Sequence, residues 1–441
     1  MKRLGLVLLL GAMPGYAAAE DLVQVFRDAL AYDAIYGAAR YAAEAGRERL
    51  PQGRALILPT IGLSGNVNRS NIDVDSRTPA VSPSFRRDTR TYASTLTLSQ
   101  PLYRPQNTIA YDQAEYQVRL AESVLSQAGQ DLVLRVSQAY FDILASRNSL
   151  DLVKAQKAAI SEQLEQAKRN FEVGTATITD THEAQSRYDL ILAQEIVASN
   201  DLDNRQRALQ QMTGKEYASL TPLRSDVRLS PPNPETMQPW VNLAERQSYG
   251  VLAQESTAAI AALEVKRQQS ANLPTVDLVA SYAYNAQSGS VSTGLGTDIR
   301  TGTIGVQAAI PIYQGGAIES RIREALANQE KSKQDLENAR RSAALAARQS
   351  YVSVVNGIAQ VRAFEQALVS GQSALESNRL GYEVGVRINI DVLNAQQQLF
   401  STRRDLAQAR YNTITNHLRL KAAAGSLRPE DLDEVNRALA P

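Results

Sequence analysis

The chain has 441 residues, no cysteine, and 47 Lys and Arg against 46 Asp and Glu, for a net charge of +1. The balanced charge gives no support to a nucleic-acid partner. The absence of cysteine excludes disulfides, and it also excludes a lipid anchor attached to a cysteine after a signal sequence. The length is sufficient for two or three domains.

The N-terminus has the three parts of a secretory signal peptide. Lys2 and Arg3 give a basic start, Leu4–Met13 is an apolar core, and Ala17–Ala19 is a small-residue cleavage site. A membrane anchor is the alternative, but the apolar core is too short to span a bilayer as a helix. We therefore expect residues 1–19 to be a signal peptide that directs the chain to a bacterial envelope.

The two halves of the mature chain, which is expected to begin at Glu20, repeat each other. Three pairs of matching residues are each separated by 211 positions: Tyr140 and Tyr351, Gly174 and Gly385, Asp180 and Asp391. Unrelated halves would not keep one offset through a long helix and the turn after it. The sequence therefore predicts a single duplicated subunit over 20–441, with repeat 1 at about 20–214 and repeat 2 at about 235–425.

Alternation of apolar with small polar residues predicts two strands in each repeat. The four strands are expected at about 60–70, 91–101, 275–285 and 302–312. In the third, Leu278 and Tyr282 share one face, while Asp277 and Ser281 share the other. Such faces suit a strand between lipid and a water-filled lumen. A half-buried strand in a soluble sandwich explains the alternation equally well.

Four strands cannot close a barrel, and their open edges are not tolerated in lipid. The mature chain has no apolar run near 18 residues, so any part of it inside a membrane must be β-strand. Two chains would give eight strands, whose interior side chains would fill, whereas three would give twelve and begin to leave a lumen. The pattern therefore predicts a homotrimer.

The remaining sequence predicts helices. Shorter helices are expected at about 21–49 and 235–269, before the strands. Proline-free segments at about 107–170 and 318–379 predict helices of roughly 90 Å, far too long for an ordinary globular domain. The first long helix has apolar residues at steps of three and four, typical of a coiled coil: Val118, Ala121, Leu125, Ala128, Leu132, Val136, Ala139 and Ile143.

The turns at 174–180 and 385–391 are expected to form the two helical tips. Gly174 and Gly385 are suitable helix ends, and Asp180 with Glu183 resembles a capping box for the returning helix. Capping alone is one explanation of the aspartates.

The tips are not equivalent, because Ala176 matches Arg387 and Thr179 matches Ile390. An arginine at one tip, with a carboxylate and a hydroxyl at the other, could form a contact between the tips.

Three parts of the sequence resemble the TolC-like outer-membrane efflux protein family most clearly: Gly381–Leu393, Ala409–Asn412 and the paired Leu-Pro-Thr strand starts at 58–60 and 273–275. The resemblance covers essentially the whole mature chain. It implies an α+β membrane protein, a trimeric 12-stranded β-barrel with four strands per chain, continued by a long α-helical coiled-coil barrel. The segments at about 214–234 and 426–441 would form an equatorial belt.

The resemblance implies a channel subunit of the cell outer membrane with a periplasmic extension. This subunit would form a passive exit duct for efflux or type I secretion, and would dock an inner-membrane transporter through a periplasmic adaptor. The family's closed gate falls at Arg387, Asp180, Thr179 and Tyr382. Its ring of carboxylates around the entrance falls at Asp391, whereas the second acidic position falls at Asn394, which is neutral.

Other candidate sites favour structural roles. His182 and His417 have no cysteine or paired carboxylate at metal spacing, so surface histidines are expected and no metal or other cofactor. Trp240 is expected to pack rather than bind a ligand. Five tyrosines near strand ends predict an interfacial girdle, with core packing as the alternative: Tyr92, Tyr103, Tyr282, Tyr284 and Tyr313.

The sequence shows no catalytic constellation, and it has neither a phosphate-binding loop nor a nucleophile elbow. We therefore expect no enzyme. The remaining alternative is a periplasmic coiled-coil scaffold or adaptor protein, which would stay soluble without detergent.

Overall fold

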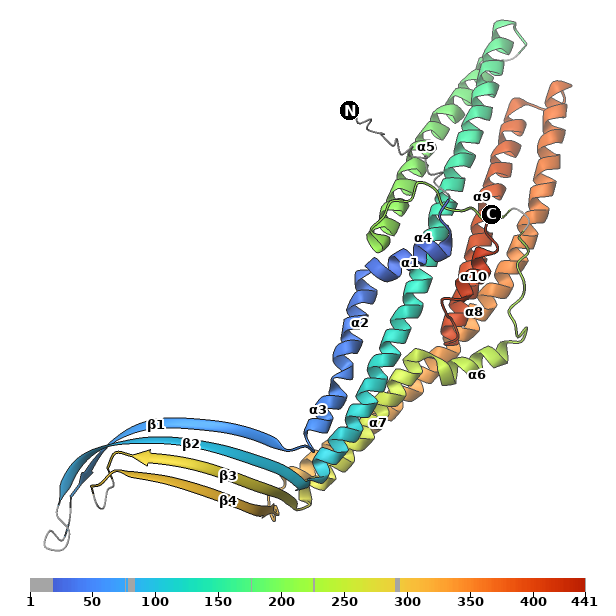
Figure 1. The fold of residues 1–441 in the computed structure, drawn as a ribbon. Coiled ribbons are helices and arrows are strands. Elements are labelled where there is room, and N and C mark those ends of the chain that lie inside the picture. Colours follow the sequence, from blue (N-terminus) through green and yellow to red (C-terminus); the bar gives the residue numbers. More distant parts are fainter. Residues whose placement is uncertain are drawn as a thin grey trace, which may run out of the picture. The chain divides into compact units, whose positions relative to one another are not determined.

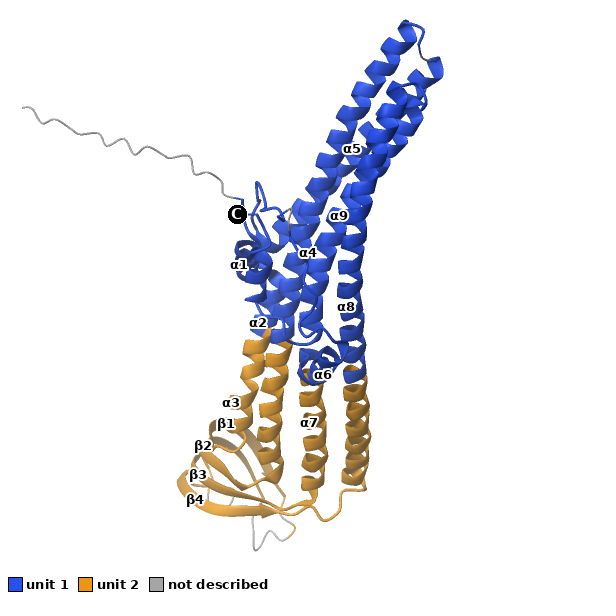
Figure 2. Cartoon of the chain, turned by 90° about the vertical axis from the view of Figure 1, so that its right-hand side faces the viewer, with its two compact units in different colours: residues 1–41, 125–251, 340–441 blue, residues 42–124, 252–339 orange. Residues whose placement is uncertain are grey.

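The computed structural model describes residues 19–75, 77, 84–175, 177–224, 227–289 and 294–440. Almost all of the predicted signal peptide and the tip residue Ala176 lie outside these residues. The chain divides into two compact units, shown in Figure 2. Unit 1 contains the residues up to Tyr41, Leu125–Val251 and the residues from Arg340 onward, and unit 2 contains Ala42–Val124 and Leu252–Ala339. Each unit therefore combines segments of both repeats, where the sequence predicted one duplicated subunit.

Unit 2 contains a four-stranded antiparallel sheet in the order β1-β2-β3-β4 (Figure 1). Its strands are β1 (Thr60–Val74), β2 (Phe85–Tyr103), β3 (Thr275–Gln287) and β4 (Thr297–Ala309). The strands extend further toward the loops than expected, because polar residues continue the ladder as far as the pair of Val74 and Phe85. The predicted strand at 302–312 was wrong at its end: β4 stops at Ala309, before Pro311, which has no N–H for a ladder.

The register places the predicted apolar positions together on one side of the sheet. Leu63 pairs with Leu96, and Leu96 pairs with Tyr282. This side is called the apolar face; Leu63 is 77% exposed and Tyr282 55% exposed on it. The opposite face carries small residues such as Ser64 and Thr95. Among the described residues, β1 and β4 each pair with one strand only, so both edges of the sheet lack a partner strand.

The long helices are α4 (Pro105–Glu172, 68 residues) and α8 (Ala317–Glu383, 67 residues). The returning helices are α5 (Ile178–Thr213) and α9 (Asn389–Ala423). The other helical segments precede the strands, follow the repeats or close the chain: α1 (Leu22–Tyr32), α2 (Ala34–Arg47), α3 (Arg49–Ala55), α6 (Met237–Gln247), α7 (Tyr249–Gln269), the 3₁₀ turn at Ser270–Asn272, and α10 (Asp431–Asn436). Among the described residues, none of the helices is both long and apolar enough to cross a membrane.

The single helices predicted at 21–49 and 235–269 are both interrupted. The first breaks at Asp33 and the second at Ser248, where the backbone is extended. Aspartate and serine favour the position before a helix, because their side chains can accept a hydrogen bond from its first turn. Asp33 does so, since its carboxylate accepts from the Tyr36 amide at 2.7 Å. Helical periodicity alone did not reveal these breaks.

The core of unit 1 joins α1, α4, α5, α9 and α10 around buried aromatic rings. Phe141 stacks on Tyr411 and meets Tyr140 edge to face. The Tyr140 hydroxyl donates to the Thr221 carbonyl at 2.7 Å and lies 3.2 Å from the Glu20 carbonyl, and its burial raises the Tyr140 pKa. Residues near both ends of the chain are bound to the segment after α5, because Glu20 bridges to Leu220 and Leu223 bridges to Leu439.

Asp33 also ties the α1–α2 break to α4. Both of its carboxylate oxygens accept from Arg135, at 2.9 and 3.0 Å, and the side chain is almost fully buried. These hydrogen bonds hold the Asp33 pKa below its usual value, against the opposing effect of burial. The contribution to stability is therefore complete above about pH 4, the pKa of a free aspartate, and is lost as the pH falls through the lowered value.

Asp33→Ala should therefore destabilise the protein by about 2–4 kcal/mol, because it removes a helix cap and leaves Arg135 without its buried partner. The matched control is Asp131→Ala, which removes the exposed partner of the same arginine and should cost below about 0.5 kcal/mol. Thermal denaturation followed by circular dichroism checks the difference. Equal shifts for the two variants would contradict a structural role of Asp33.

Candidate functional site

The first tip lies between α4 and α5, at residues 173–177. Gly174 adopts a positive φ of 78°, and the Thr175 amide closes the turn by donating to the Asn170 carbonyl at 2.8 Å. Thr177 is the N-cap of α5 and forms a capping box with Asp180. The sequence had predicted this box from Asp180 and Glu183, which was wrong by three residues, because Thr177 is the cap and Asp180 is its partner.

Asp180 has one carboxylate oxygen engaged in this cap. Its Oδ2 accepts from the Thr177 amide at 3.0 Å and from the Thr177 hydroxyl at 2.8 Å. The adjacent Thr179 is exposed on the first turn of the helix. Asp180 therefore has a local structural role, and its second oxygen is left for any contact with another chain.

The second tip lies between α8 and α9, at residues 384–388. Gly385 has a φ of 80° and closes the turn as Gly174 does. The N-cap is Ile388, which has no side-chain hydrogen bond to give. Asp391 is therefore not drawn into a capping box, and it lies 3.5 Å from the Arg387 guanidinium. Gly381 leaves room for this arrangement, because a Cβ there would lie 2.7 Å from Cγ of Arg387.

Two sets of polar contacts connect the hairpins. The Arg187 guanidinium on α5 donates to Gln397 Oε1 at 2.6 Å and to Asn394 Oδ1 at 2.9 Å on α9. Asn170 donates weakly to the Tyr382 hydroxyl at 3.4 Å. Asn394, the neutral position of the expected charge ring, is thus the acceptor of a contact between hairpins.

The sequence analysis did not identify Arg187 as a site residue, although the comparison of the two repeats contained an indication of it. At the offset of 211, Arg187 matches Gln398 and Glu183 matches Asn394, so the charge of both positions changes between the repeats. The same comparison had identified Arg387. Nothing in the sequence alone, however, placed Arg187 opposite Asn394.

The contact expected between Arg387 and Asp180 does not occur inside one chain among the described residues; Arg387 pairs with Asp391 instead. Both tips also expose apolar side chains, which are between 62 and 76% exposed: Val173, Val384, Val386 and Ile388. Such a group is more than scattered surface exposure and is typical of a surface that binds a protein partner.

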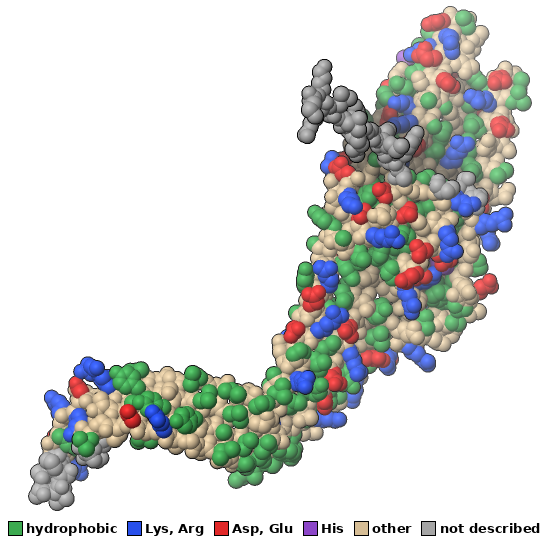
Figure 3. Space-filling model, viewed as in Figure 1, with side chains coloured by type: hydrophobic (Ala, Val, Ile, Leu, Met, Phe, Trp, Pro, Cys, Tyr) green, Lys and Arg blue, Asp and Glu red, His purple; other side chains and the backbone are tan. Residues whose placement is uncertain are grey.

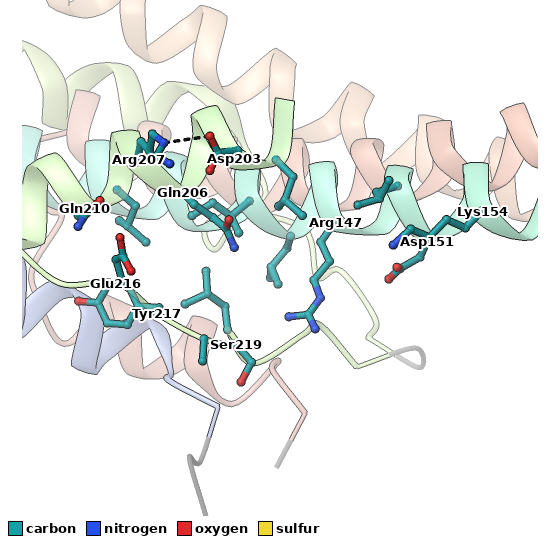
Figure 4. A pocket seen from close by; sticks show the side chains of 17 residues that line it. Arg147, Asp151, Lys154, Asp203, Gln206, Arg207, Gln210, Glu216, Tyr217 and Ser219 are labelled. Carbon is teal, nitrogen blue, oxygen red and sulfur yellow. Dashed lines mark hydrogen bonds and ion pairs between the residues drawn. The ribbon is translucent and has the colours of Figure 1, made fainter. Parts of the chain in front are cut away.

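A cavity of about 510 Å³ lies between α4, α5 and residues 216–220 (Figure 4). Its charged lining has both signs, and Arg207 pairs with Asp203 at 2.9 Å. Ser219 lines it beside charged side chains such as Glu216, and none of its lining residues is a histidine or a cysteine.

The two histidines differ in their surroundings. His182 is exposed on α5, but His417 on α9 is partly buried, and burial together with nearby Lys421 lowers its pKa. The prediction of a surface histidine was therefore wrong for His417. Trp240 is buried and packs against Val354, and its indole N–H donates to the Pro234 carbonyl at 2.9 Å. Within the described ranges, no three His, Cys, Asp or Glu side chains gather as metal ligands would.

The sheet is the second part of the candidate site. Figure 3 shows hydrophobic side chains along it and charged side chains gathered toward its loop end. The apolar positions alternate with small polar ones on all four strands. This arrangement is that of a strand with lipid on one side and water on the other.

Comparison with known proteins identifies the family. The model of the family described as "Outer membrane efflux protein" matches residues 26–215 and 240–426, one segment in each half. The chain is 33% identical to outer membrane protein TolC of Vibrio cholerae, over 98% of this chain and 96% of that protein. It is also 33% identical to the alkaline protease secretion protein AprF of Pseudomonas aeruginosa, over 95% and 87% of the two chains.

Solved structures agree on the fold. The Campylobacter jejuni CmeC outer membrane channel superposes with a TM-score of 0.78 at 16% identity, over 95% of this chain and 90% of that one. The outer membrane protein VceC of Vibrio cholerae gives 0.77 at 20% identity, over 92% and 96%. The predicted fold class is confirmed: four antiparallel strands and long helices, as in the trimeric channels with a 12-stranded barrel and a helical barrel. The chain belongs to the outer membrane efflux protein family, and it is an outer-membrane channel protein of efflux or secretion.

Proposed function

We propose that three copies of this chain form a passive exit duct that crosses the outer membrane and continues into the periplasm. The observation that carries this proposal is the sheet, which has two open edges and an exposed apolar face in a single chain. Unpaired backbone groups cannot remain open in lipid. Pairing of β4 of one chain with β1 of the next satisfies them, and three chains provide twelve strands with an open lumen.

The dimensions of the sheet support this arrangement. Tyr103 and Tyr92 mark the two ends of the apolar part of β2 and are 11 positions apart. At about 3.3 Å per residue they are separated by roughly 36 Å along the strand. A strand tilt of about 40° reduces this to roughly 28 Å, the thickness of the hydrocarbon layer.

The helical tips are the proposed contact with the rest of the export machinery. Their exposed valines and Ile388 offer an apolar surface for a periplasmic adaptor, which would connect the duct to an inner-membrane transporter. Two relatives are named for the secretion of proteases and others for efflux. Kinship with these channels supports the role of a conduit rather than that of an enzyme.

The gate is proposed to lie at the tips, between neighbouring chains. Because Arg387 does not reach Asp180 within its own chain, the lock would join Arg387 to Asp180 and Thr179 of the next copy. Tyr382 and Asn170, together with Arg187 and Asn394, would hold the two hairpins of each chain in register. Opening would then require three equivalent sets of contacts to separate, which makes the gate a two-state element.

Asp391 is the proposed charge at the entrance. Three copies near the axis would attract cations, while Arg387, 3.5 Å away, would offset part of that field. Asn394 carries no charge, so the entrance would have one ring of carboxylates, formed by Asp391 of the three copies.

Asp391→Asn should lower the cation preference of the open channel and weaken block by multivalent cations added from the periplasmic side. The matched control is Asp405→Asn, which removes a carboxylate from α9 beyond the tip, where Arg404 pairs with it. Reversal potentials in planar bilayers under a salt gradient measure the effect. Unchanged selectivity in Asp391→Asn would show that this carboxylate does not face the ion path, and failure of both the parent and the Arg387→Ala variant to conduct would end the duct proposal.

Arg387→Ala should raise the conductance of the resting channel several-fold, because it removes the lock, and should make cells more permeable to large antibiotics. Exposed ion pairs contribute only about 0–1 kcal/mol each, but three copies act together. Asp180→Asn separates locking from capping, since asparagine still caps a helix without the charge. If Asp180→Asn conducts like the parent while Asp180→Ala opens or unfolds the tip, Asp180 is a cap only.

A further inference from the structure

The apolar face of the sheet changes from apolar to cationic within one pair of residues. Val67 and Tyr92 are paired on this face, and the next pair toward the loops is Arg69 and Arg90. Two residues advance a strand by about 7 Å. The side chains of Arg69 and Arg90 therefore lie on the apolar face, two positions closer to the loops than Tyr92.

This arginine pair is unfavourable unless an anion lies near it. Directly opposed side chains on an antiparallel pair have Cβ atoms about 5 Å apart, and like charges at that spacing are destabilising. Arg69 has one partner, Asp88, at 2.8 Å. No side chain among the described residues forms an ion pair with the Arg90 guanidinium.

The nearby carboxylates do not neutralise Arg90. Asp73 pairs with Arg86, and Asp88 pairs with Arg69. Asp298 lies on β4, two strands away, at the level of Tyr92. Two strands correspond to about 10 Å. Arg300 lies on β4, on the same face as Asp298, and adds another cation. Its Cζ atom is 5.8 Å from the centroid of the Tyr284 ring.

We propose that Arg69 and Arg90 form a binding site for the phosphate of an anionic lipid headgroup in the outer leaflet of the membrane. Guanidinium groups bind phosphate through pairs of parallel hydrogen bonds. Tyrosines mark the boundary between hydrocarbon and headgroups, so the next residues outward lie at the depth of the lipid phosphates. The inference rests on the proposed function, because it places this sheet in a membrane.

The acyl chains of such a lipid have a complementary surface below the arginines. Tyr92 is 48% exposed and Leu96 46% exposed on the same strand, and Leu63 lies opposite. A free phosphate ion would gain only the polar contacts, whereas a lipid gains both. The site therefore selects phosphorylated lipid over soluble phosphate.

Native mass spectrometry of the detergent-solubilised full chain, titrated with dioleoyl phosphatidic acid, tests the site. Arg69→Gln with Arg90→Gln should lower the apparent affinity about tenfold, the effect of losing roughly 1.4 kcal/mol. The matched control is Arg321→Gln with Arg323→Gln, which removes equal charge from two exposed arginines of α8 and should change nothing. Arg69→Lys with Arg90→Lys keeps the charge and should retain intermediate affinity.

Equal binding by the Gln double variant and the parent would overturn the site. Full displacement of the lipid by inorganic phosphate at equal concentration would also overturn it, since the site would then recognise free phosphate. Bilayer recordings of the same samples separate the two proposals. Conducting channels with unaltered lipid binding in the Gln double variant would refute the lipid site alone, whereas lipid binding without conduction by either the parent or the Arg387→Ala variant would refute the duct.

Discussion

The structure depends on one constraint, which is that every backbone N–H and C=O needs a partner when water is absent. Within one chain, β1 and β4 leave one edge each without partners, and the adjacent apolar face makes exposure to water equally unfavourable. Association with further copies provides partners for both edges, and insertion of the closed sheet into a membrane removes the apolar face from water. Oligomerisation is therefore part of the fold of this chain, and the lumen follows from the number of copies needed to close the sheet.

The duplication provides two similar tips, and their differences create the chemistry. Thr177 caps α5 and binds Asp180, whereas Ile388 at the matching position leaves Asp391 free to meet Arg387. A similar substitution between repeats gives Arg187, which connects α5 to Asn394 on α9. If the two tips had the same sequence, each would present the same charged groups to the other. The tips differ in charge because the repeats have diverged, as at Ala176 and Arg387.

The strands, the long helices and the duplication could be predicted from the sequence, because the pattern of apolar residues is regular over long segments. Alternation on the strands identified the apolar face, since each side chain of a strand has only two directions to point. Breaks within helices were harder, because Asp33 and Ser248 interrupt otherwise good helical patterns through local capping. Contacts such as that of Arg187 with Gln397 depend on how the two hairpins pack against each other. Residue spacing within a single helix gives no information about this packing. The cap at Thr177 could have been predicted, because Thr177 and Asp180 have the spacing of a capping box, but the prediction paired Asp180 with Glu183 instead.

Disulfide cross-linking between the two open edges tests the central claim most directly, because the chain has no cysteine of its own. Ser64→Cys on β1 would be combined in turn with a cysteine at Thr301, Thr303 or Gly305 on β4, all on the polar face. Ser64→Cys with Thr95→Cys, paired within one chain, is the control that should not change size. We expect at least one combination to give a covalent trimer on a non-reducing denaturing gel, which a thiol reductant converts to monomer. Only monomers or only dimers in every combination would contradict edge-to-edge closure by three chains.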